Sequence, residues 1–173
     1  VPPASPAEAA WSTPITAGGP SQMTTDAAGN LYVAETGSNR ILKYTPGGTL
    51  LKAIGSFGTG QAQFNTPKGV SVEPGGAIFV ADTGNDRVLV FRAVTEFEAI
   101  NLEPVQVIDD LATPYDLDVS DGGTPFTPAD DRLYVANTGR NEVRRYVRED
   151  GTWRLTGSLG DLGSGTGRFA GPV

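Results

Sequence analysis

The sequence predicts an all-β protein built from repeated units of four short antiparallel strands. One pattern occurs three times, as residues 30–44 (NLYVAETGSNRILKY), 77–91 (AIFVADTGNDRVLVF) and 132–146 (RLYVANTGRNEVRRY). Equivalent valines in the copies (Val33, Val80, Val135) lie 47 and 55 residues apart. No window of about a dozen residues shows the apolar stripe of a helix. A period of this length, with several short strands in each copy, is typical of a β-propeller blade.

Each unit contains four predicted strands. The first is a five-residue run that ends at Thr25, Val72 or Val119, after a proline at position 20, 67 or 114. The second carries the β-branched, aromatic and small apolar residues that a half-buried pleated surface favours, at residues 31–34, 78–81 and 133–136. A Thr-Gly turn follows, in which we expect glycine to adopt a positive φ (Gly37, Gly84, Gly139). The third strands are residues 40–44, 87–91 and 142–146, and the fourth are residues 50–54, about 104–108, and 153–157.

The chain divides into an N-terminal arm and a series of units. Residues 1–19 are rich in Pro and Ala, which indicates a linker or an arm lying on a neighbour. The units span residues 20–66, 67–113 and 114–168, and residues 169–173 begin a fourth. Residue 1 is Val, and two interpretations stay open: a secretory signal cleaved upstream, or an artificial boundary.

These units resemble the NHL repeat family. The resemblance rests on the order P-x-G-V-x-V and then G-x-x-F-V-A-D-T-G-N-x-R-V, and it is clearest over residues 67–88. It extends from about residue 20 to the C-terminus, and residues 169–173 (FAGPV) parallel residues 64–67 (FNTP). The resemblance implies a propeller, commonly six-bladed, so the three units correspond to half of such a ring.

Composition argues against catalysis. The chain has 173 residues, with no cysteine and no histidine, so it lacks a disulfide, a thiolate and the commonest general base. It contains no G-x-S-x-G motif. The related propeller lyases and lactonases use histidine or metal ligands at the central channel. We therefore expect no enzymatic activity and no cofactor, with one alternative: a fragment of a metal-dependent lyase or lactonase whose catalytic residues lie in absent blades.

Charge is unevenly distributed along the chain. The net charge of −7 opposes nonspecific binding to nucleic acid. Residues 93–131 contain ten acidic residues and no basic residue, whereas residues 132–173 contain seven arginines and four acidic residues. No run of about 18 apolar residues occurs, so we expect no membrane-spanning helix.

A set of polar residues recurs beside the Thr-Gly turns. Short polar side chains at such positions bond their own backbone and cap the hairpin, and an arginine there can bridge to a neighbouring blade. We assign structural turn and blade-bridging roles to Glu35, Asn39, Arg40, Asp82, Asp86, Arg87, Asn137 and Asn141. Glu142 replaces the arginine in the third unit, where the bridge should be missing or reversed.

Two charged groups are candidates for partner binding. The acidic group is Asp116, Asp118, Asp121, Asp130 and Asp131; the basic group is Arg144, Arg145 and Arg148. Residues 116–122 loosely resemble a calcium loop, but the glycine comes one place late and no glutamate closes the loop. Calcium is thus an alternative to a solvated acidic loop or a docking surface for a basic partner. For the arginines, the alternatives are local ion pairs and a basic RNA-binding surface like that used in part of the family.

Three blades do not close a propeller ring, because the end blades would expose a face and unpaired edges. The chain could be part of a longer propeller, two copies could form a ring, or open ends could stack head to tail. We expect a non-catalytic scaffold or protein–protein interaction module, with a protein partner or copies of itself. It could be a structural subunit of a larger assembly, in an extracytoplasmic location.

Overall fold

The strands form three four-stranded antiparallel sheets, which confirms the all-β propeller-blade prediction. The computed structural model describes residues 18–92, 104–120, 130–160 and 171–173. The first sheet contains β1 (Pro20–Thr25), β2 (Leu31–Glu35), β3 (Arg40–Tyr44) and β4 (Leu50–Ile54). The second contains β5 (Gly69–Val72), β6 (Ile78–Asp82), β7 (Arg87–Phe91) and β8 (Pro104–Ile108). The third contains β9 (Pro114–Ser120), β10 (Arg132–Asn137), β11 (Glu142–Glu149) and β12 (Thr152–Leu159).

Each sheet is a blade in which neighbouring strands follow one another in the chain. A short 3-10 turn joins the second strand to the third in every blade: η1 (Thr36–Ser38), η2 (Thr83–Asn85) and η3 (Thr138–Arg140). The strands β11 and β12 are longer than the sequence pattern predicted. Asp150 (φ 49) and Gly151 (φ 78) form a two-residue turn with left-handed backbone, and this turn type lets both strands continue to its edge.

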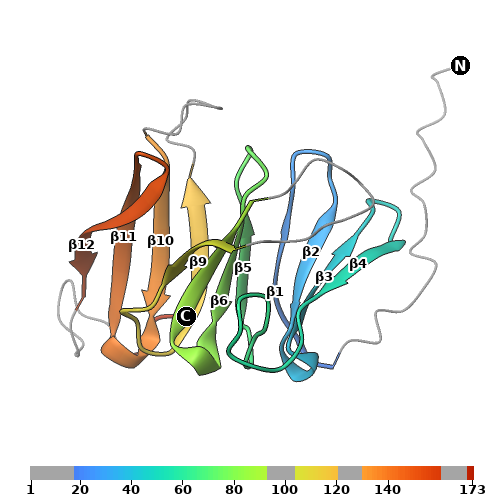
Figure 1. Cartoon of the computed structure of the whole chain (residues 1–173), viewed down its shortest axis with the longest axis horizontal. Coiled ribbons are helices and arrows are strands. Elements are labelled where there is room, and N and C mark those ends of the chain that lie inside the picture. The colour runs from blue at the N-terminus through green and yellow to red at the C-terminus, as the bar shows by residue number, and fades with distance from the viewer. Residues whose placement is uncertain (1–17, 93–103, 121–129, 161–170) are drawn as a thin grey trace, which may run out of the picture.

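The blades fan out from their first strands, as Figure 1 shows. The first strand of the second blade lies between its counterparts, because β5 contacts both β1 and β9. The fourth strands β4 and β12 lie at the two sides of the fan. No helix in the described parts of the chain is long and apolar enough to cross a membrane.

Apolar side chains fill both interfaces between blades. Between the first and second blades, Phe64 meets Phe91 edge to face with ring centroids 6.1 Å apart. Between the second and third, Trp153 meets Phe79 at 5.4 Å in the same geometry. Strands of the middle blade are buried on both faces, which explains the nearly continuous apolar runs of β6 and β7. The first strands of the blades (β1, β5 and β9), which we call the inner strands, are therefore held on a rigid support.

We predict that Leu133→Ala lowers the free energy of unfolding by about 2 to 5 kcal/mol, because it leaves a cavity in the interface between the second and third blades. Leu133 is 0% exposed and belongs to that interface. Leu155→Ala is the matched control in the same blade, since Leu155 is 48% exposed. Urea denaturation measures both; equal effects of the two substitutions would contradict the described packing.

Candidate functional site

The segment after the second strand of each blade carries the recurring polar residues, and we call it the corner: residues 35–39, 82–86 and 137–141. The first residue of each corner is fully buried (Glu35, Asp82, Asn137). Its side-chain oxygen accepts a hydrogen bond from a backbone N–H two residues before the blade's first proline. The donors are Gly18 (2.9 Å), Asn65 (2.6 Å) and Ala112 (2.7 Å). This bond ties the corner to its own inner strand.

The threonine of each corner reaches the next blade. The Thr36 hydroxyl donates to the carbonyl of Pro67 at 2.7 Å, and the Thr83 hydroxyl donates to the carbonyl of Pro114 at 2.7 Å. In the third blade, Thr138 makes the same bond to Pro172. Pro114 begins β9 and Pro67 lies two residues before β5, so the threonine fixes where the next blade starts.

The last residue of each corner also binds the next blade. Asn39, Asp86 and Asn141 have left-handed backbone (φ 54, 55 and 55), a conformation that Asn and Asp tolerate. Their side-chain oxygens accept from the N–H groups of Thr66 (2.7 Å), Thr113 (2.6 Å) and Gly171 (2.9 Å). We expected these side chains to bond their own backbone. They reach the following blade instead, because the left-handed turn aims them away from the hairpin.

The role predicted for the corner glycines was wrong. Positive φ belongs to the corner's last residue, and Gly37, Gly84 and Gly139 are not among the left-handed positions. The glycine is needed for close approach. A Cβ on Gly139 would lie 2.8 Å from the carbonyl oxygen of Ala112, and the Gly139 N–H donates to that same oxygen at 2.9 Å. Any side chain at this position would push the corner away from the segment that precedes the first proline of the blade.

The arginines that follow the first two corners, Arg40 and Arg87, bond different sets of partners. Arg40 pairs with Glu35 of its own blade, and this bond lowers the pKa of the Glu35 carboxyl. Arg87 pairs with Asp82 at 2.7 Å and also donates to the carbonyls of Thr59, Gly60 and Gln63. Arg87 thus ties the second blade to the segment that arrives from the first blade.

At the third corner, the acidic residue stands where arginine follows the other two corners. Asn137 stands in the acid position and donates to Glu142 at 2.7 Å. The guanidinium comes from Arg144, which donates to Glu142 at 2.7 Å and pairs with Asp110 at 3.2 Å. Arg144 was a partner-binding candidate, but it is 6% exposed, and it donates to Glu142 of its own strand and to Asp110 in the segment that arrives from the second blade. The expected loss of the arginine at position 142 is compensated from the same strand.

The remaining charged candidates do not form one surface. Asp118 and Arg145 are exposed, Asp116 lies in the first strand of the third blade and lines a pocket, and Asp131 is buried. Asp121 lies outside the described residues. No group of three or more acidic residues converges as metal ligands would within the described ranges.

Arg148 belongs to a buried ion cluster between two blades. Its guanidinium lies 3.3 Å from Glu73 of the second blade and 3.8 Å from Asp131 of the third. Burial raises the pKa of the Glu73 carboxyl, Arg148 opposes this effect, and Asp131 adds to it. Arg148 therefore links neighbouring blades at the end of β5, opposite the corners.

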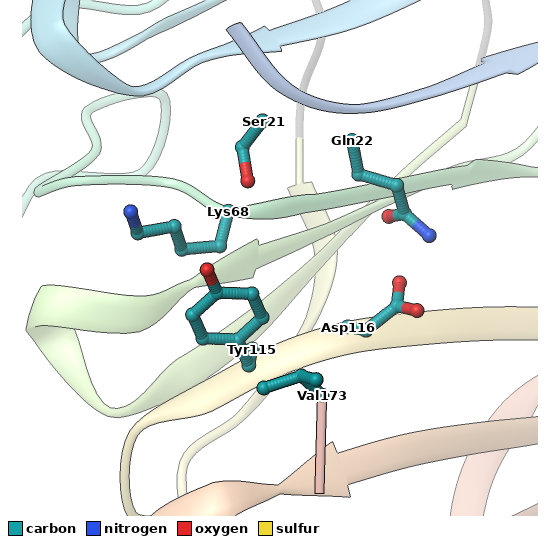
Figure 2. A pocket seen from close by; sticks show the side chains of 6 residues that line it. All are labelled: Ser21, Gln22, Lys68, Tyr115, Asp116 and Val173. Carbon is teal, nitrogen blue, oxygen red and sulfur yellow. The ribbon is translucent and has the colours of Figure 1, made fainter. Parts of the chain in front are cut away.

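A pocket lies where the inner strands begin. It has a volume of about 260 Å³ and is lined by Ser21, Gln22, Lys68, Tyr115, Asp116 and Val173. Ser21, Lys68, Tyr115 and Val173 each follow the first proline of a unit, so they occupy one repeat position around the fan. Figure 2 shows Ser21, Lys68 and Tyr115 on one side of the pocket, with Gln22 and Asp116 facing each other on the other. We call this the axial pocket.

Local bonds shape the axial pocket. The Gln22 side-chain oxygen accepts from the Val70 N–H at 2.7 Å, which joins β1 to β5. The Lys68 ammonium lies 5.5 Å from the centre of the Tyr115 ring. Burial raises the pKa of the Asp116 carboxyl, although the Leu117 N–H donates to it. Of these residues, sequence reasoning selected only Asp116; the signal for the others was the position after each first proline.

Comparisons with known proteins agree with this architecture. Residues 64–91 match the family model of the NHL repeat. The chain carries an NHL repeat. This NHL segment runs from the end of the first connection to the end of β7, and it includes the corner of the second blade. No curated protein sequence matches the chain.

Solved structures share the fold at low sequence identity. Hydrazine synthase of Kuenenia stuttgartiensis is 15% identical with a TM-score of 0.62, covering 91% of this chain and 39% of that one. A periplasmic gluconolactonase of Pseudomonas aeruginosa is 15% identical with a TM-score of 0.62, covering 89% and 41%. Virginiamycin B lyase of Staphylococcus aureus is 15% identical with a TM-score of 0.53, covering 79% and 40%. This chain thus spans about 40% of their length and matches part of six-bladed propellers.

We predict that Gly139→Ala destabilises the fold by about 1 to 3 kcal/mol, because the added Cβ overlaps the linker backbone. Gly47→Ala is the control, since its Cβ would meet nothing closer than 3.8 Å and its φ is not left-handed. That substitution should leave stability unchanged or raise it by about 0.5 kcal/mol. Chemical denaturation of both variants decides; an unaffected Gly139→Ala would contradict the close approach.

We predict that Glu35→Gln lowers stability at pH 7 by about 1 to 3 kcal/mol, because it weakens a buried charge-assisted bond. The pKa of Glu35 is lowered from 4.5 in the folded state, so its stabilising effect is present above that value and is lost as pH falls. The variant should therefore lose less stability on acidification than the wild type does. Urea titrations at several pH values measure this, with the exposed Glu149→Gln as control. Parallel pH profiles would contradict the role of Glu35.

Proposed function

We propose that this chain is a non-catalytic propeller scaffold that acts through protein–protein contacts of its blade faces. The observation that carries the proposal is the outward face of the third blade. Tyr134 and Leu159 on that face are 40% and 61% exposed. With Val143 and Arg145 they line a hollow of about 290 Å³. Exposed apolar surface of this kind marks protein contact sites.

The repeat shows what kind of surface fits this face. The positions of Tyr134, Val143 and Leu159 correspond to Tyr32, Ile41 and Ile54 in the first blade, and to Phe79, Val88 and Ile108 in the second. In those blades the same positions are buried against the following sheet. The matching occupant of the exposed face is therefore another four-stranded blade.

The third corner favours one source for that blade. Its acceptor Asn141 already binds the N–H of Gly171, and Thr138 already binds the carbonyl of Pro172. The first blade of a second copy would bring Gly19 and Pro20 to the same two groups and would compete with residues 171 and 172. This competition argues against a ring made of two copies. It leaves the exposed face to a blade of a different protein, which is the contact that the scaffold proposal requires.

An enzymatic role is the second candidate, and it has a specific observation in its favour. Two of the solved structures with the same fold are named as a gluconolactonase and a virginiamycin B lyase. Likeness at 15% identity concerns the fold, and function depends on the site. Hydrolase or lyase turnover by a purified closed propeller that contains this chain would overturn the scaffold proposal.

We also infer an extracytoplasmic location, supported by the Pro- and Ala-rich composition of residues 1–19. The proposed scaffold would then serve as a subunit of an assembly outside the cytoplasm, with a protein as partner. Cell fractionation checks this location. Recovery of the protein from the cytoplasmic fraction alone would contradict it.

We predict that residues 1–173 associate in a concentration-dependent way and that Leu159→Glu suppresses this association, because a charge on the exposed face opposes its burial. Light scattering after gel filtration measures the mass. Leu155→Glu is the control, because Leu155 pairs with Tyr146, which packs toward the second blade. A compact dimer would support a ring of two copies. Identical monomers from wild type and Leu159→Glu would contradict the docking face.

A further inference from the structure

The structure assigns a second property to this chain: we propose that the axial pocket binds a small organic carboxylate through Lys68, Tyr115 and Ser21. These three side chains come from three different blades. Lys68 offers an ammonium group, and Tyr115 and Ser21 each offer a hydroxyl group. The pocket volume of about 260 Å³ suits a small molecule rather than a macromolecule. The site is distinct from the exposed face of the third blade, and it does not depend on the scaffold role.

Lys68 supplies the charge for this site. Its ammonium lies over the Tyr115 ring, and no carboxylate of the described residues lies within 4.0 Å of it. Lys68 is partly exposed as a residue. A cation without a counter-ion among the described residues attracts an anion, and a carboxylate accepts charge-assisted hydrogen bonds from it.

A second lysine shows what a fully paired arrangement looks like in the same fold. Lys43 lies 4.9 Å from the centre of the Tyr32 ring, so it repeats the stacking of lysine on tyrosine. Lys43 also lies 3.5 Å from the carboxylate of Asp26. The aromatic contact therefore does not distinguish the two lysines. The difference is a carboxylate within 4.0 Å, which Lys43 has and which Lys68 lacks in the part of the chain that the structure describes.

The two hydroxyls complete the donor side. Figure 2 places the Ser21 hydroxyl above the Tyr115 hydroxyl, with the Lys68 side chain beside them. A carboxylate has two oxygens and accepts several bonds at once, which fits an ammonium flanked by two hydroxyl donors. The Val173 side chain and the Tyr115 ring give the pocket apolar walls, so the fitting ligand carries an apolar body.

The opposite side of the pocket sets the orientation of the ligand. The Gln22 oxygen is used by the Val70 N–H, and Asp116 faces the Gln22 amide. The charged form of Asp116 repels an anion, so the carboxylate of the ligand lies toward Lys68 and its apolar body lies away from it. Gly69 makes this arrangement possible, since a Cβ there would lie 3.1 Å from the Gln22 side-chain oxygen.

The test uses the full chain with benzoate as the probe and benzamide as its uncharged counterpart. Isothermal titration or NMR shift mapping should show saturable binding of benzoate and none of benzamide. Lys68→Met keeps the stem and removes the charge, and it should weaken benzoate binding about tenfold or more. Tyr115→Phe should weaken it about threefold to tenfold by removing one neutral donor. Asp116→Asn should tighten it, because a like charge is removed.

Lys43→Met is the matched control, because it removes a lysine from the same kind of aromatic contact outside the pocket. It should leave benzoate binding unchanged. Circular dichroism and thermal melts establish that each variant is folded, and Tyr115→Phe provides a second reading if Lys68→Met does not fold. The proposal is overturned if benzoate and benzamide bind equally, if neither binds, or if Lys43→Met and Lys68→Met lose binding to the same degree.

Discussion

The arrangement of the blades depends on the hydrogen bonds that each corner makes to the start of the next blade. Apolar packing between sheets is strong but non-directional, so it sets their separation better than their rotation. Hydrogen bonds have preferred angles. The side chains of Asn39, Asp86 and Asn141 hold the backbone ahead of each following proline, and the threonines hold the proline itself. The inner strands therefore begin at matching heights, and the axial pocket is a product of that alignment.

Much of the fold could be predicted from the sequence, because strand patterning and turn residues are local signals that occur three times. The order of strands and the all-β class depend only on those signals. The reason for the corner glycines could not be predicted, since Gly139 is constrained by Ala112, 27 residues earlier. The axial pocket was missed for a related reason. Ser21, Lys68 and Tyr115 share a repeat position but are three different residue types, so no motif links them before the blades are placed side by side.

The acidic residues that are clustered in the sequence at positions 93–131 lie at different sites in the folded chain, as the described ones show. Asp110 follows β8, Asp116 lies in β9 and Asp131 precedes β10, so these acids come from different segments of the fold. Asp110 reaches the third corner, Asp116 turns to the axial pocket, and Asp131 meets Arg148 between blades. The buried Asp131 carboxylate lies close to the Arg148 guanidinium, as a charged group away from water requires, whereas the Asp110 side chain is 71% exposed. Three acidic residues of one stretch therefore take part in three separate polar contacts. Two of them, at Asp110 and Asp131, are ion pairs that hold the blades together.

The exchanged charges of the third corner bear on how repeat proteins diverge. Glu35 with Arg40, and Asp82 with Arg87, place acid before base, whereas Asn137 with Glu142 places the acid second and takes its guanidinium from Arg144. In all three cases, the backbone N–H two residues before the first proline donates to a side-chain oxygen of the corner. Selection on such a corner acts on matching donors and acceptors rather than on residue identity. Duplicated blades can therefore change residues through compensating pairs while the hydrogen bonds of the corner stay the same. Shared geometry persists after the sequences of the repeats have diverged.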